Sequence, residues 1–308
     1  MHGFIANTDY DWYEFLRHRP DLDEVNFWAP SGRAVMRSIQ PGEPFFFRLK
    51  KPHYRIAGFG YFVHASTVPL SLAWEAFEDK NGAADLPSMR GRVLQYRAKA
   101  VAAGQDPSIG CRMITSPIFF PPDLWVDSPR DWKANVVVGA TYDLTAGEGQ
   151  RIWRSCLDRS RAMLPQAVGP SDDTSARYGT PTIQQTRLGQ GSFRIAVADA
   201  YNRSCAVTTE HSLPVLEAAH IRQYSDGGSH QVSNGLLLRA DLHRLFDRGY
   251  VTVDPDYRFH VSQRLRDEWH NGRVYYELDG REILRPDRAA DWPDRTALEH
   301  HCQRVFLQ

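Results

Sequence analysis

The stretch from Leu216 to Tyr250 constrains this chain more than any other part of the sequence. It reads LEAAHIRQYSDGGSHQVSNGLLLRADLHRLFDRGY. His220 ends an apolar segment, and Asn234 follows a turn marked by Gly-Gly. His243 and Asp247 are four residues apart, a spacing that places two side chains on one face of a helix. Metal-assisted hydrolysis needs such a set: an imidazole that deprotonates water, and a pair of side chains that can hold a divalent cation.

Length and composition allow about two domains. The chain has 308 residues, of which 42% are hydrophobic and 12% aromatic, so real cores can form. The 37 basic and 37 acidic residues balance, which argues against a generic polycation that coats nucleic acid but allows a local basic face. Every cation after Lys133 is arginine. Arginine suits bidentate phosphate contacts, although the codon bias of a GC-rich genome is the simpler explanation.

The sequence also bears on the compartment. We find no run of about 18 apolar residues, and therefore expect no membrane span. The N-terminus, MHGFIANTDYDWYEF, has an early acidic residue and no basic lead, so we do not expect it to be a signal peptide. The four cysteines are scattered without C-x-x-C spacing, which favours neither a structural zinc site nor a disulfide framework. We expect a cytoplasmic protein with reduced thiols.

Residues 1–145 are predicted to form a compact domain of strands with a few helices. Runs rich in aromatic and β-branched residues, bounded by turn signals, predict strands. These runs are GFIAN, VNFWAP, PFFFRLK, YRIAGFGYFVHAS, CRMITSPIFF and WKANVVVGATYDL. Helices are predicted for Tyr10–Arg17, for LSLAWEAFED and for LPSMRGRVLQYRAKAV.

The remainder is predicted to hold a join and a second domain, which makes the whole chain α+β. Residues 146–190 contain a helix, GQRIWRSCLDRSRAML, followed by a linker rich in Gly, Ser, Thr and Pro. Residues 191–308 form the second domain. Its predicted elements are a helix FRIAVADAYNRSC, a strand PVLEAAHI, a helix LLLRADLHRLFDRG ended by Gly249, a hairpin VTVDPDYRFHVS and a terminal helix HCQRVF.

The N-terminal domain resembles the EVE branch of the PUA-like fold, which is related to the YTH readers of methylated adenine in RNA. The resemblance rests on the order FIAN, helix, FWAPSG, PGEPFFFRLK, IAGFGYF, and then a helix that carries a Trp. It implies a small twisted β-barrel with helices that reads a modified base swung out of its stack. An extruded base needs aromatic walls to replace its lost stacking and polar groups to check its edge.

The same resemblance suggests which residues would bind that base. Trp28 matches the Trp at the end of the family's second strand, which forms one wall of the cage. Trp74 lies where a second wall is expected. Asn7 and Ser31 flank the same mouth and could contact the base edge. A Trp in a small barrel can equally be a core residue, so both interpretations of the Trp residues stay open.

The stretch analysed first resembles the HNH superfamily residue by residue. His220 matches the first His, which acts as general base from the first strand of a hairpin in the ββα-metal architecture. Asn234 matches the Asn that orients the base. His243 matches the second His, a metal ligand on the following helix, and the Asp247 position carries a further ligand in some members, including colicin-type nucleases. The resemblance implies one divalent ion, Mg²⁺ or Mn²⁺, and no structural zinc.

The chain departs from the HNH pattern at Ala219. Many members carry Asp or His there as a metal ligand, so the number of ligands is in doubt. Glu217 could substitute, because residues two apart on a strand face the same side. Alternatively, Glu217 forms a salt bridge to Arg222 or Arg239. Four other histidines lie outside the pattern and are expected to face solvent: His211, His230, His260 and His270.

The two halves together resemble the EVE-HNH modification-dependent restriction endonucleases. This implies a double-stranded DNA partner that carries 5-methylcytosine or 5-hydroxymethylcytosine, extrusion of that base, and hydrolysis of nearby phosphodiesters. Two alternatives stay open: a nuclease whose first domain binds RNA or unmodified DNA, and a non-catalytic nucleic-acid-binding protein. Since a single HNH centre cuts one strand, a homodimer is possible.

Overall fold

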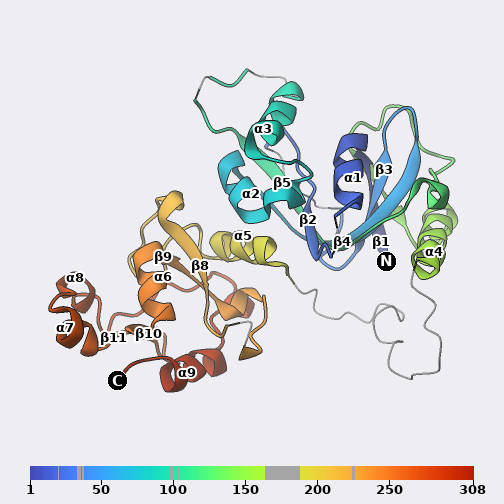
Figure 1. The fold of residues 1–308 in the computed structure, drawn as a ribbon. Helices are drawn as coiled ribbons and strands as arrows, with labels where there is room; N and C mark the ends of the chain where they lie inside the picture. The colour runs from blue at the N-terminus through green and yellow to red at the C-terminus, as the bar shows by residue number, and fades with distance from the viewer. Residues whose placement is uncertain are drawn as a thin grey trace. The chain divides into compact units, whose positions relative to one another are not determined.

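A computed structural model describes residues 1–19, 21–32, 36, 38–97, 100–102, 104–163, 188–223 and 226–308. The chain divides into two compact units, Met1–Thr186 and Arg187–Gln308 (Figure 1). Most of the predicted linker falls in residues 164–187, outside the described residues. No helix in the described parts of the chain is both long and apolar enough to cross a membrane.

The first unit is built on a seven-stranded mixed sheet with the order β2-β5-β4-β3-β1-β7, in which β6 also pairs with β4. β1 and β3 run parallel, whereas the other pairs are antiparallel. The strands are β1 (His2–Thr8), β2 (Glu24–Asn26), β3 (Pro44–Leu49), β4 (Arg55–Pro69), β5 (Ser108–Phe119), β6 (Val126–Asp127) and β7 (Gly139–Asp143). Among the described residues, β2 and β7 are the two ends of this order.

The aromatic run of β3 explains how helices cover this sheet. Successive side chains of a strand point to opposite faces. Phe47 meets Trp12 of one helix with ring centroids 5.3 Å apart, whereas Phe46 meets Trp153 of another at 5.9 Å. Trp12 and Phe47 belong to one cluster of buried residues, and Phe46 and Trp153 belong to another. The two clusters therefore cover opposite faces of the sheet. The helices of this unit are α1 (Tyr10–Arg17), α2 (Leu70–Phe77), α3 (Leu86–Gln95) and α4 (Gly147–Ala162).

The predicted strand WKANVVVGATYDL is only partly correct, because β7 starts at Gly139. The preceding residues form a loop that the end of β1 holds in place. The Asn7 side-chain amide donates to the carbonyl oxygens of Val136 and Val137 at 2.9 and 3.0 Å. Val137 is 81% exposed, so this run of valines does not face a core. The predicted strand VNFWAP is likewise shorter, since β2 ends before Trp28.

The second unit combines two hairpins with short helices around one core. β8 pairs with β9 and β10 with β11, both antiparallel. The β8–β9 hairpin lies beside α6 (Figure 1). The elements are α5 (Gln190–Ala200), β8 (Leu216–His220), β9 (Gly235–Arg239), α6 (Ala240–Asp247), β10 (Val251–Val253), β11 (Phe259–Val261), α7 (Arg264–Trp269), α8 (Arg273–Tyr276) and α9 (Arg295–Arg304).

The prediction of one helix over LLLRADLHRLFDRG is wrong in its first part. The three leucines and Arg239 belong to β9, where Leu236 pairs with Ala219 and Leu238 with Glu217. A short apolar run can be strand or helix by periodicity alone, and here pairing with β8 decides. The predicted end at Gly249 is confirmed: its φ of +76° suits glycine, and a Cβ there would lie 2.0 Å from the Val305 carbonyl oxygen.

Candidate active site

The end of the β8–β9 hairpin brings His220 opposite Gly235. Gly235 has no side chain, and this allows α5 to pack close. A Cβ at this position would lie 2.6 Å from Val197 Cγ2 and 2.9 Å from Phe193 Cζ. The Asn-Gly pair therefore has two roles. Asn234 forms hydrogen bonds to the loop after β8, and Gly235 leaves room for α5 to pack against the end of the strand that carries His220.

His220 lies between two other rings. Its imidazole stacks on Phe193 with centroids 4.0 Å apart and an interplanar angle of 11°. The His230 ring lies 5.1 Å away. Nε2 of His220 is buried and has no hydrogen-bond partner among the described residues. Burial lowers the pKa of His220 to about 4, with further lowering from His230 and His243. The ring is therefore neutral at neutral pH and can accept a proton.

Asn234 ties together the loop that follows β8. The residue is only 5% exposed. Its side-chain oxygen accepts from the Arg222 N–H at 3.0 Å, and its amide nitrogen donates to the carbonyl oxygens of Arg222 and Ser229 at 2.9 and 2.8 Å. Its own carbonyl accepts from the Ile221 N–H at 2.9 Å. These four bonds fix the backbone that continues from His220.

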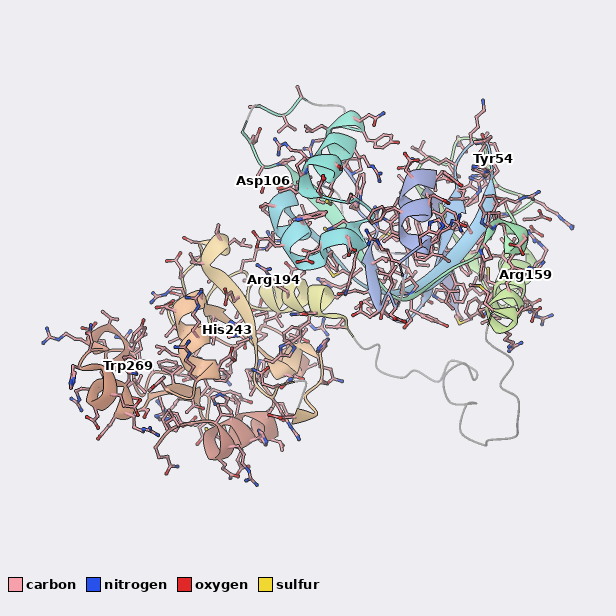
Figure 2. The ribbon with its side chains drawn as sticks, viewed as in Figure 1. Tyr54, Asp106, Arg159, Arg194, His243 and Trp269 are labelled. Carbon is pink, nitrogen blue, oxygen red and sulfur yellow. The ribbon has the colours of Figure 1, made fainter. Side chains whose placement is uncertain are left out.

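His243, which Figure 2 labels on α6, lies between the carboxylates of Glu217 and Asp247. Its Nδ1 is 2.7 Å from Glu217 Oε2, and its Nε2 is 3.3 Å from Asp247 Oδ2. The other Asp247 oxygen accepts from Gln223 Nε2 at 3.1 Å. Glu217 thus contacts His243, whereas Arg239 pairs with Asp241 at 2.6 Å. Within the described residues, no three His, Cys, Asp or Glu side chains converge as a metal site.

Two neighbours of His220 escaped the sequence analysis. His230 was expected to face solvent, and this is wrong, because it lies against His220 and its Nδ1 is 2.9 Å from the Leu188 carbonyl oxygen. Phe193 lies on α5, and an aromatic residue in an amphipathic helix is indistinguishable from any other core residue in sequence. His211 and His270 are exposed, as expected. His260 is partly buried and pairs with Asp254 at 2.7 Å.

The four candidate base-binding residues of the first unit are dispersed over its elements. Trp28 follows β2, is partly buried, and donates its indole N–H to the Asn81 carbonyl at 3.0 Å. Trp74 lies partly buried on α2, and Ser31 is exposed. Asn7 lies at the end of β1. No hydrogen bond or ring contact joins any two of these four within the described residues.

Asn7 uses its whole side-chain amide in local bonds. Besides the two valine carbonyls, its oxygen accepts from Arg48 Nη1 at 2.7 Å. Arg48 is 6% exposed, and its guanidinium carbon lies 4.3 Å from the Trp132 ring centroid and 5.1 Å from that of Tyr54, which Figure 2 labels. Asn7 therefore orders a buried cation among aromatic rings at this edge of the sheet.

Comparison with known proteins identifies the chemistry of the second unit. Residues 205–254 match the family described as HNH endonuclease. No curated protein matches the chain. Among solved structures, ASCH from Zymomonas mobilis has 10% identity and a TM-score of 0.31, covering 49% of this chain and 94% of that chain. The modification-dependent TagI restriction endonuclease has 15% identity and a TM-score of 0.29, covering 98% and 81%. The family match spans β8, β9 and α6, and the protein is a nuclease.

Proposed function

We propose that this nuclease is a DNA endonuclease in which His220 is the general base and His243 and Asp247 hold one divalent ion, Mg²⁺ or Mn²⁺. The observation that carries this proposal is the bonding of Asn234, which fixes the loop beside a neutral His220. HNH endonucleases generally use a divalent ion, and an imidazole nitrogen with a carboxylate oxygen suits several such ions. We assign no structural zinc.

The protein groups divide the work of hydrolysis. His220 takes a proton from the attacking water, which a ring kept neutral by burial can do at neutral pH. Phe193 supports its ring, and Asn234 fixes the loop that follows it. A divalent ion, when bound, supplies stabilisation of the charge that develops on the phosphate and on the leaving oxygen. Two protein ligands are enough for Mg²⁺, which usually keeps several waters and takes substrate phosphates.

We further propose that the first unit is a PUA-like barrel that extrudes and reads 5-methylcytosine or 5-hydroxymethylcytosine in double-stranded DNA. Trp28 and Trp74 would supply the walls, and Ser31 would check the base edge. The resemblance of residues 1–145 to the EVE branch supports this assignment, as does the exposure of Ser31. The Asn7 side chain already bonds to Val136, Val137 and Arg48, so it would have to break one of these hydrogen bonds to contact the base edge. We therefore propose a secondary role for Asn7 in base binding.

Digestion of three duplexes of identical sequence tests this reader. They carry cytosine, 5-methylcytosine or 5-hydroxymethylcytosine at one site. We expect cleavage of a modified duplex and none of the unmodified one. Trp28→Ala should abolish the preference, whereas Trp269→Ala, which changes a 63% exposed Trp of the second unit, should preserve it. The same duplexes also report on two copies acting together, since one centre cuts one strand and a homodimer would cut both.

The outcomes separate the two halves of the proposal. Equal cutting of all three duplexes would contradict the proposed recognition of modified cytosine but not the proposed nuclease activity. Tighter binding of RNA than of any DNA duplex would show that the first unit binds RNA and not modified DNA. Absence of cleavage in Mg²⁺, Mn²⁺ and other divalent ions, for the wild type as for His220→Ala, would contradict the catalytic assignment.

A further inference from the structure

The imidazole of His243 has a carboxylate at each of its two nitrogens. Glu217 approaches from β8 and Asp247 from one turn further along α6. The two nitrogens of an imidazole point away from each other. An ion that binds one nitrogen together with its neighbouring carboxylate therefore leaves the other carboxylate on the opposite edge of the ring. The absence of a three-residue convergence in the described parts of the chain agrees with this geometry.

The contacts at the two nitrogens differ. Nδ1 and Glu217 Oε2 are 2.7 Å apart and form a hydrogen bond. Nε2 and Asp247 Oδ2 are 3.3 Å apart, which is a longer contact. In a neutral histidine, the nitrogen that donates to a carboxylate carries the proton, and the other nitrogen keeps its lone pair. That leaves the Nε2 lone pair on the side of Asp247.

Strand geometry places Glu217 where it can reach His243. Glu217 and Ala219 lie two residues apart on β8 and face the same side, toward α6. Ala219 has no donor atom, so the position next to His220 offers no metal ligand. The longer Glu217 side chain lies on this face two residue pairs further from the hairpin end, where it meets His243 of α6.

We propose that Glu217 is a positioning residue of the metal site. It accepts the Nδ1 hydrogen bond of His243 and so turns Nε2 toward the cation that Asp247 shares. The inference rests on the proposed function, because it takes His243 and Asp247 as the ligands. Outer carboxylates of this kind raise ligand basicity and fix the ring, and their loss typically weakens metal binding by about 10–100-fold.

A purely structural pair gives a different expectation. The Glu217 side chain is 42% exposed and that of His243 is 22% exposed. Exposed ion pairs contribute little to stability, typically about 0–1 kcal/mol. If Glu217 only joined β8 to α6, its substitution would leave the affinity for metal ions nearly unchanged.

Metal titration of the full chain without DNA tests the inference. Calorimetry with Mn²⁺ gives the dissociation constant of the wild type, Glu217→Gln and Glu217→Ala. We expect weakening of about 10–100-fold for Glu217→Ala. Glu217→Gln should fall between, because its amide oxygen can still accept the Nδ1 hydrogen bond. Glu299→Gln is the matched control: Glu299 is exposed on α9, and its carboxylate accepts from Gln303. It should bind as the wild type does.

Two-bond ¹H–¹⁵N spectra of the same proteins provide a second readout. In the metal-free wild type, the Nδ1 of His243 should carry the proton and Nε2 should not. Glu217→Ala should lose this preference, and circular dichroism melting should show that the variant is folded. Affinity of Glu217→Ala within about twofold of the wild type, or loss of the Nδ1 proton on metal binding, would overturn the inference.

The failure of the proposed function looks different. His243→Ala and Asp247→Ala should each abolish Mn²⁺ binding. If the wild type binds Mn²⁺ and both variants bind it equally well, the ligand assignment is wrong, and Glu217 has no site to position. If both variants lose binding while Glu217→Ala keeps it, the ligands stand and only the positioning role falls.

Discussion

The surroundings of His220 set the protonation state of its ring. Burial lowers the pKa of His220 to about 4, and the neighbouring His230 and His243 lower it further, so the uncharged imidazole is favoured. The stack on Phe193 is part of that burial. An ordinary histidine is half protonated near pH 6.5. The base form of His220 therefore persists through mildly acidic conditions, in which an exposed histidine would be lost as a base.

Replacement of Phe193 tests, through the rate of cleavage, whether burial keeps the His220 ring uncharged. In single-turnover cleavage at saturating Mn²⁺, the wild-type rate should be nearly the same at pH 5.5 and pH 7.5. Phe193→Leu exposes the ring and moves its pKa toward 6.5, so its rate at pH 5.5 should fall by up to roughly tenfold relative to its own rate at pH 7.5. Phe306→Leu, a change near the C-terminus of the same unit, should behave as the wild type.

The comparison of pH values within one protein separates titration from a simple loss of folding. A wild-type rate that already falls with a midpoint near pH 6.5 would show that burial does not hold the ring neutral. An identical pH ratio for Phe193→Leu and the wild type would show that the stack has no influence on the base.

Asn234 makes a second prediction at the residue scale. Its amide group donates two hydrogen bonds and accepts one in a buried setting. Asn234→Asp keeps the acceptor but loses both donors and brings a carboxylate close to two carbonyl oxygens. Each buried group left unsatisfied costs about 1–3 kcal/mol, so the thermal midpoint should fall clearly. Ser233→Ala, at the neighbouring partly buried position, serves as control; an equal shift in both variants would contradict the special role of Asn234.

Single residues show what sequence alone could supply. The segment PVLEAAHI was predicted as a strand and the four-residue spacing of His243 and Asp247 as one helix face, and both agree with the structure. The second strand of the hairpin was implied by the HNH resemblance, whereas the apolar pattern assigned it to a helix. Neighbours from elsewhere in the chain were not predictable. Phe193 comes from the preceding helix α5, and His230 lies against His220 although it comes later in the chain.

At the scale of elements, the contact of α5 with the β8–β9 hairpin depends on Gly235. Gly235→Ala adds a Cβ within 2.6 Å of Val197 and 2.9 Å of Phe193, which must push the helix away. Overpacking of this kind typically costs about 1–3 kcal/mol. Because Phe193 moves with the helix, the cleavage rate should fall as well. Urea unfolding and single-turnover cleavage measure the two effects.

Gly91 provides a control of opposite sign. It is exposed in α3, and a Cβ there meets nothing within 4 Å. Gly91→Ala should stabilise the first unit by roughly 0.5–1 kcal/mol, because alanine loses less backbone entropy in a helix. Equal effects of the two substitutions would show that the close packing at Gly235 does not matter.

The elements also show why part of the fold was predicted correctly. The strands β1, β3 and β4 and the helix α1 combine strong local composition with clear turn signals, and sequence and structure agree. Leu236–Arg239 was assigned to a helix because an apolar run carries no period of its own. The valines at 136–138 suggested a strand, yet the Asn7 amide holds their carbonyls in a loop, a contact between distant residues that local reasoning does not contain.

At the scale of the whole molecule, the second unit contains a buried histidine that couples its stability to pH. His301 is 2% exposed, stacks on Phe246 with ring centroids 3.7 Å apart, and contacts Thr252 Oγ1 at 2.8 Å. Burial lowers its pKa to about 4. The unfolded chain takes up this proton near pH 6.5, so the free energy of unfolding falls as the pH drops from 6.5 toward 4.

This linkage predicts an acid-sensitive second unit. For His301 alone, the free energy of unfolding should be lower by about 2 kcal/mol at pH 5 than at pH 7.5. His220 contributes in the same direction. Denaturant unfolding of wild type and His301→Gln at the two pH values measures the effect, and the variant should show the smaller pH difference. The same pH difference in both proteins would mean that His301 is already protonated in the folded state.

The arrangement of the first unit shows the limit of a sequence pattern for a whole domain. The strands except β6 could be predicted one by one, at least in part, but their order could not, since the parallel pairing of β1 with β3 joins strands separated by α1 and β2. The packing of α4 against the sheet depends on the contact between Phe46 and Trp153. The sequence of neither segment predicts this contact by itself. Modified-base reading by this unit stays a proposal.

The central claim is that His220 removes the proton from the attacking water. The most direct test is the single-turnover rate of phosphodiester cleavage at saturating Mn²⁺ for wild type and His220→Ala, with DNA affinity measured separately. General-base catalysis contributes about 10²–10⁴-fold, so the variant should cleave at least about 100-fold more slowly and bind DNA as tightly as the wild type. Cleavage by His220→Ala within a fewfold of the wild-type rate would contradict the account.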